Sequence, residues 1–176
     1  MGQYYHPIVL DADGNIVVWM DAHMYQNGLK LTEHSFLTNN FVSTFEFGLT
    51  PEGPHHKTRV VWAGDYADNE PGDENNLYHH CSEYNLICPS AKDTTEYHYV
   101  INHSKKQFVD KMKVPANKDG FRLHPLPLLT CEGNGRGGGD YRDGCPIVGS
   151  WARDVISVEK GAPDNFEEII FDLLVA

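Results

Sequence analysis

Short apolar runs separated by turn residues form the dominant pattern of this chain. The runs 4–10 and 15–20 flank Asp11-Ala12-Asp13-Gly14, and Asp-Gly between apolar runs is a strong signal for a β-hairpin. Residues 97–102 and 107–110 predict a second hairpin. Further strands are predicted over 58–63 and 151–159, a short extended piece over 28–31, and a short buried strand over the apolar run 126–131.

One segment has the period of an amphipathic helix. Phe41, Phe45 and Leu49 recur at four-residue spacing, which predicts a helix over 36–49 with Ser35 as its N-cap. Residues 75–84 fit a second short helix, and residues 166–175 fit a strand or a helix equally well. These elements predict an α+β fold: a single globular domain over 1–176, with a mainly antiparallel sheet and one or two short helices.

The charge balance narrows the classes of partner. Among 176 residues, 25 are acidic and 14 are Lys or Arg, so the formal net charge is −11. Such a surface repels nucleic acids and anionic membranes and favours a basic partner. There is no signal sequence, no apolar stretch of about 18 residues, and only four cysteines, which we expect to be reduced thiols. We therefore expect a cytoplasmic protein that contacts neither nucleic acid nor membrane.

A glycine-dense loop is the most distinctive stretch. Five glycines in seven residues permit positive φ angles and a close approach of a ligand or another backbone segment. Nucleotide-binding motifs do not fit it, because Gly144 and Pro146 stand where a helix should begin and no Lys-Ser or Lys-Thr pair follows the glycines. The loop consists of Gly133, Asn134, Gly135, Arg136, Gly137, Gly138, Gly139 and Asp140.

We interpret this loop as a binding site for a small anion such as a nucleotide. Successive backbone N–H groups in a glycine-rich turn can hold an anion, and Arg136 could close over it. Asp65 and Tyr66, which follow an apolar strand, are predicted to form the opposite wall. The alternative is a purely structural loop in which Arg136 pairs with Asp140 or Asp143.

Catalytic alternatives have weaker support. Five carboxylates lie between residues 65 and 74, so Asp65 with Asp68 or Asp140 could hold a divalent ion for metal-assisted hydrolysis, although such a loop can equally face water. The cysteines and histidines lack zinc-binding spacing, and no nucleophile motif is present. The sequence leans towards a binding protein, with no cofactor indicated.

Four stretches resemble a group of small uncharacterised bacterial and phage proteins. They are the start MGQYY, residues 28–31 with 33–35, residues 62–68, and GNGRGGGDY from Gly133 followed by Trp151. The resemblance implies a bacterial or phage origin and carries no activity. In size and charge the chain is also similar to phage inhibitors of host defence systems, which gives a second hypothesis: an acidic inhibitor that binds a basic host protein.

Overall fold

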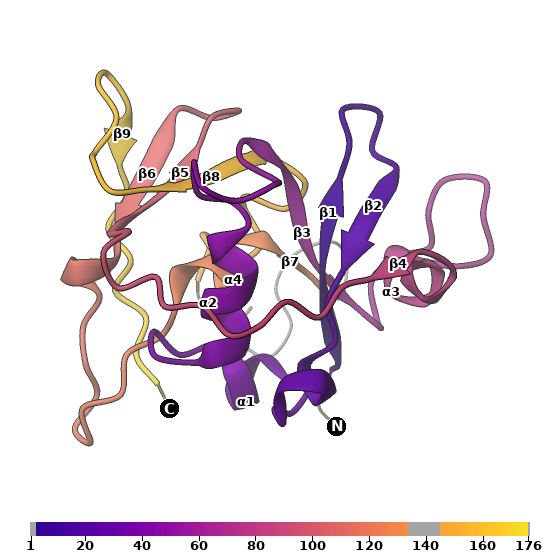
Figure 1. Ribbon diagram of the computed structural model, residues 1–176, viewed down its shortest axis with the longest axis horizontal. Coiled ribbons are helices and arrows are strands. Elements are labelled where there is room, and N and C mark those ends of the chain that lie inside the picture. The colour runs from indigo at the N-terminus through magenta and orange to yellow at the C-terminus, as the bar shows by residue number, and fades with distance from the viewer. Residues whose placement is uncertain (1–2, 134–144, 176) are drawn as a thin grey trace.

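The computed structural model describes residues 3–133 and 145–175, which are organised by a mixed β-sheet (Figure 1). Within these residues the strand order is β4-β2-β1-β3-β8-β5-β6-β9, and β7 pairs with β3 off this path. The strands are β1 (Tyr5–Leu10), β2 (Ile16–Trp19), β3 (Thr58–Gly64), β4 (Asn85–Leu86), β5 (Tyr99–Asn102), β6 (Gln107–Asp110), β7 (Cys131–Glu132), β8 (Val155–Glu159) and β9 (Glu167–Glu168).

The longer strand pairs are antiparallel. β1 pairs with β2 and β3, and β5 pairs with β6 and β8. β3 also pairs antiparallel with β8, over two residues per strand. The parallel pairs β2–β4, β3–β7 and β6–β9 each join only two residues per strand. Both predicted hairpins, and the α+β class with its mainly antiparallel sheet, are therefore confirmed.

The helical elements of the described residues are short. The α-helices are α1 (Leu31–His34), α2 (Asn40–Phe47), α3 (Leu77–His80) and α4 (Pro125–Thr130), and the 3₁₀ turns are η1 (Ala22–Tyr25), η2 (Cys81–Glu83) and η3 (Lys111–Lys113). The helix predicted over 75–84 is present as α3 followed by η2. Between residues 166 and 175 only β9 is regular, so the helical alternative for this segment is wrong.

Two sequence predictions fail because a cap decides where a helix begins. The predicted strand 126–131 is mostly helix α4, since the His124 ring accepts the Leu126 N–H and Pro125 occupies the first helical turn. Helix α2 begins four residues later than predicted, because Phe36 makes a bridge to Leu123 and the Asn39 side chain, not Ser35, caps the helix.

Other predicted boundaries need smaller corrections. The piece 28–31 does not stay extended, since Leu31 opens α1. Residues 151–153 form a turn, and the predicted strand 151–159 is regular only over β8. Turns and strand ends depend on contacts with distant segments, which a local pattern does not contain.

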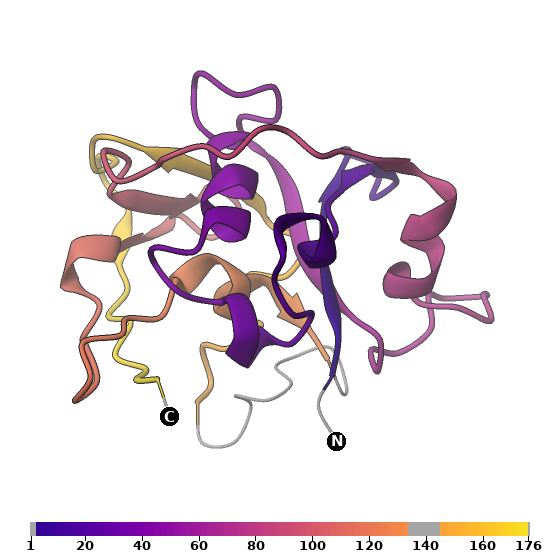
Figure 2. The same ribbon diagram turned by 60° about the horizontal axis from the view of Figure 1, so that its bottom comes forward.

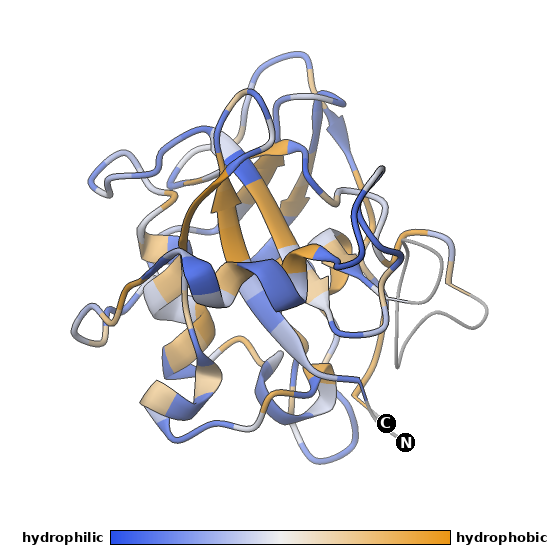
Figure 3. Ribbon diagram, turned by 90° about the vertical axis from the view of Figure 1, so that its right-hand side faces the viewer, coloured by the Kyte–Doolittle hydropathy of each residue, from blue (hydrophilic) through white to orange (hydrophobic). Residues whose placement is uncertain are grey.

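Apolar side chains cover both faces of the strands β1 and β3. Val60 and Trp62 of β3 belong to a main core that α2 and α4 also enter, whereas Val61 and Ala63 belong to a second core with Leu77 of α3. Figure 3 shows the hydrophobic strands at the centre and more hydrophilic loops around them. The continuous apolar run of β3 is thus explained by burial on both faces.

A buried tryptophan–histidine pair links β3 to α1. The Trp62 indole N–H donates to His34 Nε2 at 2.9 Å, and His34 Nδ1 lies 2.9 Å from the Gly28 carbonyl oxygen. Because indole is only a donor, Nε2 must be the acceptor and Nδ1 must carry the proton of a neutral ring. Burial lowers the pKa of His34 from 6.5 to about 4.

We predict that His34 makes the fold acid-sensitive. The unfolded chain takes up this proton near pH 6.5, but the folded protein does so only near pH 4, so stability is complete above pH 6.5 and falls as the pH drops towards 4. The loss from this group is at most about 3 kcal/mol. Urea unfolding of the parent and of His34→Gln at several pH values should show a shallower decline in the variant. His6, whose pKa burial also lowers to about 4, would supply part of the remaining decline; equal slopes in both proteins would contradict the assignment.

Candidate functional site

Most of the glycine-dense loop lies outside the described residues. Gly133 is described and is buried directly after β7, whereas 134–140, including Arg136 and Asp140, fall in the part of the chain that is not described. The anion-binding role of Gly133, Asn134, Gly135, Arg136, Gly137, Gly138, Gly139 and Asp140 therefore stays a prediction.

The structure places Asp65 beside the start of that loop. β3 and β7 run parallel with Ala63 opposite Glu132, so Gly64 and Gly133 leave the sheet at the same edge. The approach is close: a Cβ at Gly64 would lie 2.3 Å from the Glu132 carbonyl oxygen, which explains the glycine. The segment of Asp65 and Tyr66 and the first residue of the glycine-dense loop, Gly133, are thus adjacent where they leave β3 and β7.

The charged side chains at this edge form hydrogen bonds with other groups of the same chain. The Asp65 carboxylate accepts the Tyr4 backbone N–H at 3.0 Å, and Tyr66 is 45% exposed. Arg153 donates to Glu70 and Glu132 with two hydrogen bonds to each. Within residues 3–133 and 145–175, no group of three His, Cys, Asp or Glu side chains is placed to hold a metal ion. The metal-assisted hydrolysis hypothesis therefore gains no support from the described carboxylates.

A different site lies over helix α2. Residues 87–98, which we call the strap, leave β4 and cross α2 to reach β5 in both ribbon views (Figure 1 and Figure 2). Hydrogen bonds fasten the strap to the helix: Ser43 Oγ donates to the Lys92 carbonyl oxygen at 2.8 Å, and the Lys92 N–H donates to Thr44 Oγ1 at 3.1 Å. An irregular segment is thereby held in one place against a regular element.

The strap, α2 and η3 line an open pocket of about 710 Å³, which we call the strap pocket. Its lining combines apolar, hydroxyl and charged side chains from segments distant in sequence. These residues are Leu37, Thr38, Asn40, Ser43, Ala91, Lys92, Asp93, Thr94, Thr95, His98, Lys111, Met112 and Arg122. Asp65 and Tyr66 are not among them.

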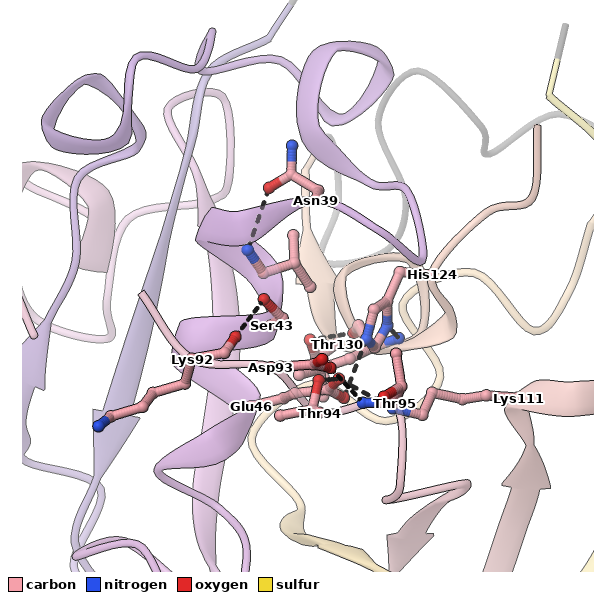
Figure 4. A network of polar contacts seen from close by, with 12 residues as sticks. Asn39, Ser43, Glu46, Lys92, Asp93, Thr94, Thr95, Lys111, His124 and Thr130 are labelled. Carbon is pink, nitrogen blue, oxygen red and sulfur yellow. Dashed lines mark hydrogen bonds and ion pairs between the residues drawn. The ribbon is translucent and has the colours of Figure 1, made fainter. Parts of the chain in front are cut away.

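A buried carboxylate joins three segments next to this pocket (Figure 4). Glu46 of α2 has no exposed surface, and its Oε1 accepts hydrogen bonds from the Thr94 hydroxyl and from Lys111 Nζ, the latter at 2.8 Å. Its Oε2 lies 2.9 Å from His124 Nε2. Thr94 and Lys111 also line the strap pocket, so they connect the pocket to the buried carboxylate.

The cap of α4 fixes the proton position on His124. Nδ1 accepts the Leu126 N–H at 3.1 Å, so the proton of the neutral ring is on Nε2, facing Glu46. This Nε2–H is poorly aligned for a hydrogen bond despite the short distance. Burial lowers the pKa of His124, even though Glu46 acts in the opposite direction. A neutral His124 leaves Lys111 as the cation that balances Glu46.

The Glu46 carboxyl stays ionised. Burial alone would raise its pKa, but the facing Nε2–H of His124 and the ammonium group of Lys111 outweigh burial and hold the pKa of Glu46 below its usual value. A buried carboxylate is tolerated when it is both hydrogen-bonded and paired with a charge, and Glu46 has both kinds of partner. Lys111 is held by the same contacts, with its side chain only 7% exposed.

The other charged residues around the pocket are mainly basic. Arg122 donates three hydrogen bonds to the backbone carbonyl groups of Lys111, Met112 and Val114, and no carboxylate of the described residues forms an ion pair with it. Lys92 places Nζ 5.6 Å from the centre of the Phe47 ring. Asp93 is the lone acidic side chain among the described lining residues. The lining thus holds three basic side chains and one described carboxylate, in a chain of net charge −11, and Glu46 balances one of the three cations.

The sequence analysis missed this site. Glu46 was a usable signal, because it lies three or four residues from Val42 and Leu49 within the predicted apolar face, where a carboxylate needs a buried partner. Its partners Thr94 and Lys111 are 48 and 65 residues away, and nothing local singles them out.

Comparisons with protein-family models, curated proteins and solved structures found no match. None of the helices in the described part of the chain is long and apolar enough to cross a bilayer. The case for a function therefore rests on the geometry of the strap pocket and its charges.

We predict that the Glu46–Lys111 pair is strongly coupled. Lys111→Met leaves a buried carboxylate without its cation, which typically costs about 3–5 kcal/mol of unfolding free energy. Adding Glu46→Gln removes the charge, so the double variant should be more stable than Lys111→Met alone, as measured by urea unfolding at neutral pH.

Lys113→Met provides the matched control, because Lys113 pairs with Glu168 with its side chain 66% exposed, and solvent screening makes the contribution of an exposed pair to stability small. A double variant no more stable than Lys111→Met would show that lost packing, not an unpaired charge, causes the damage.

Proposed function

We propose that the protein binds a small organic anion in the strap pocket. The observation that carries the proposal is the composition of the lining: it includes Lys92, Lys111 and Arg122 and one described carboxylate, Asp93, in a chain whose net charge is −11. Lys111 is balanced by Glu46, whereas Arg122 donates to backbone carbonyl groups and pairs with no carboxylate of the described residues. A basic pocket in an acidic protein concentrates anions locally while the rest of the surface repels them. This contrast favours an anion that is small enough to be enclosed.

The size and composition of the pocket fit a small molecule. Its volume of about 710 Å³ lies in the range of roughly 300–1,000 Å³ typical of ligand sites. Leu37, Ala91 and Met112 supply apolar contacts, and Ser43, Thr94 and Asn40 supply polar groups. Such a mixture binds an organic body with one charged group better than it binds a bare inorganic ion.

The cations are positioned before a ligand arrives. Lys111 is oriented by its hydrogen bond to Glu46 and lines the pocket. Arg122 is held by the carbonyl groups at the end of η3. Groups that are already ordered lose less conformational entropy on binding, which raises affinity.

The proposed ligand is a small anion, as expected from the sequence, but it binds in the strap pocket and not in the glycine-dense loop. The glycine-dense loop, Asp65 and Tyr66 remain a separate prediction at the β3–β7 edge, and the acidic-inhibitor hypothesis remains a prediction from charge alone. Neither hypothesis requires a ligand in the strap pocket. Blocking this pocket therefore separates the present proposal from both.

We predict that filling the pocket abolishes anion binding. Calorimetry and thermal unfolding with a panel of short carboxylates, phosphates and uncharged amides of the same shape should detect binding of anions only. A ligand at a hundred times its dissociation constant should stabilise the fold by about 2.7 kcal/mol. Ala91→Trp, on the exposed part of the strap, should remove this stabilisation, and added salt should weaken it.

Ser90→Trp is the matched control, because Ser90 is exposed on the same strap but does not line the pocket. It should bind anions like the parent. Two results would refute the proposal: no anion of the panel binds, or Ala91→Trp binds them as well as Ser90→Trp does.

A further inference from the structure

A second hollow adjoins the strap pocket at the N-terminal end of α2. Its volume is about 340 Å³, and it is lined by Phe36, Thr38, Asn39, Asn40 and Phe121. Thr38 and Asn40 also line the strap pocket, so the two hollows share a wall. We call this second hollow the aromatic hollow.

The two hollows differ in chemistry. The charged side chains Lys92, Lys111 and Arg122 belong to the strap pocket, whereas the lining of the aromatic hollow contains no charged residue and two phenylalanines. Phe121 is 57% exposed although its ring is 6.0 Å from that of Phe36, and Met112 at the strap pocket is 59% exposed. Large apolar side chains exposed beside a pocket mark a surface that gains free energy when a ligand covers it.

Resting on the proposed function, we propose that the two hollows form one bipartite site for a single-chain amphiphilic anion. The anionic head group occupies the strap pocket near Lys111 and Arg122, and the apolar chain runs past Thr38 and Asn40 to cover Phe36 and Phe121. Charge complementarity selects the head group, since the cations lie at one end only. The uncharged aromatic end selects a chain, because an anion there would lose hydration without gaining a cationic partner.

The arrangement makes affinity depend on chain length. Each methylene group that is removed from water on binding contributes a free energy equivalent to roughly a fourfold gain in affinity. Short acids fill the strap pocket alone, so they should bind without involving Phe121. Longer acids should gain affinity until the chain passes the aromatic hollow.

The test is calorimetry with straight-chain alkyl carboxylates and alkyl phosphates of increasing length, each below its micelle concentration. We expect affinity to rise with length in both series, and the two head groups distinguish a carboxylate from a phosphate ligand. Alkyl trimethylammonium ions of the same lengths should bind at least tenfold more weakly. Phe121→Ala should weaken the longest anions about tenfold and leave the shortest unchanged.

Met24→Ala is the matched control, because Met24 is 53% exposed and lines neither hollow. It should match the parent at every length. Affinity that is independent of length, or long-chain binding that Phe121→Ala does not change, overturns the bipartite site but leaves the proposed function intact. Equal binding of the cationic amphiphiles overturns the role of the cations, and binding of no anion of any length overturns both proposals.

Discussion

The buried carboxylate of Glu46 is the constraint on which the arrangement around the strap pocket depends. A charge without exposed surface must be balanced and hydrogen-bonded, and here the partners come from the strap, from η3 and from the cap of α4. Each partner belongs to a segment that has little regular structure of its own. Satisfying one carboxylate therefore joins α2 and the cap of α4 to the two segments that flank the hairpin β5–β6.

The interactions of Glu46 also fix the positions of Lys111 and of the strap, which line the pocket. Lysine side chains are usually exposed, but that of Lys111 is almost fully buried because its ammonium group pairs with Glu46. Lys111 also lines the pocket. Thr94 fixes the strap in the same way, and Ser43 and Thr44 add two more contacts between the strap and α2. The pocket is thus built on a preformed polar floor, whereas its rim carries exposed apolar side chains such as Met112. The proposal of an amphiphilic anion rests on this combination of a buried ion pair and exposed apolar side chains.

The β3–β7 edge is held together by other interactions than the strap pocket. There the close approach of Gly64 to the Glu132 carbonyl oxygen brings two chain segments together, and Arg153 holds Glu70 and Glu132 with paired hydrogen bonds. Its charged groups pair with one another, whereas Arg122 at the strap pocket donates to carbonyl groups alone among the described residues. The lining of the strap pocket contains no residue of β3 or β7, so the two regions are separate.

By itself, the sequence determined the elements whose stabilising contacts are local or periodic. The Asp-Gly turn and the apolar runs on either side of it were sufficient for the hairpin β1–β2, and the spacing of Phe41 and Phe45 was sufficient for the body of α2. The tertiary structure decided the features that depend on distant partners. The His124 side chain caps the apolar run that forms α4, and the bridge between Phe36 and Leu123 makes α2 begin later than predicted. Lys111 pairs with Glu46 although 65 residues separate them in the sequence. Local patterns record periodicity and turns, but a buried charge is satisfied only by whichever segment the fold brings to it.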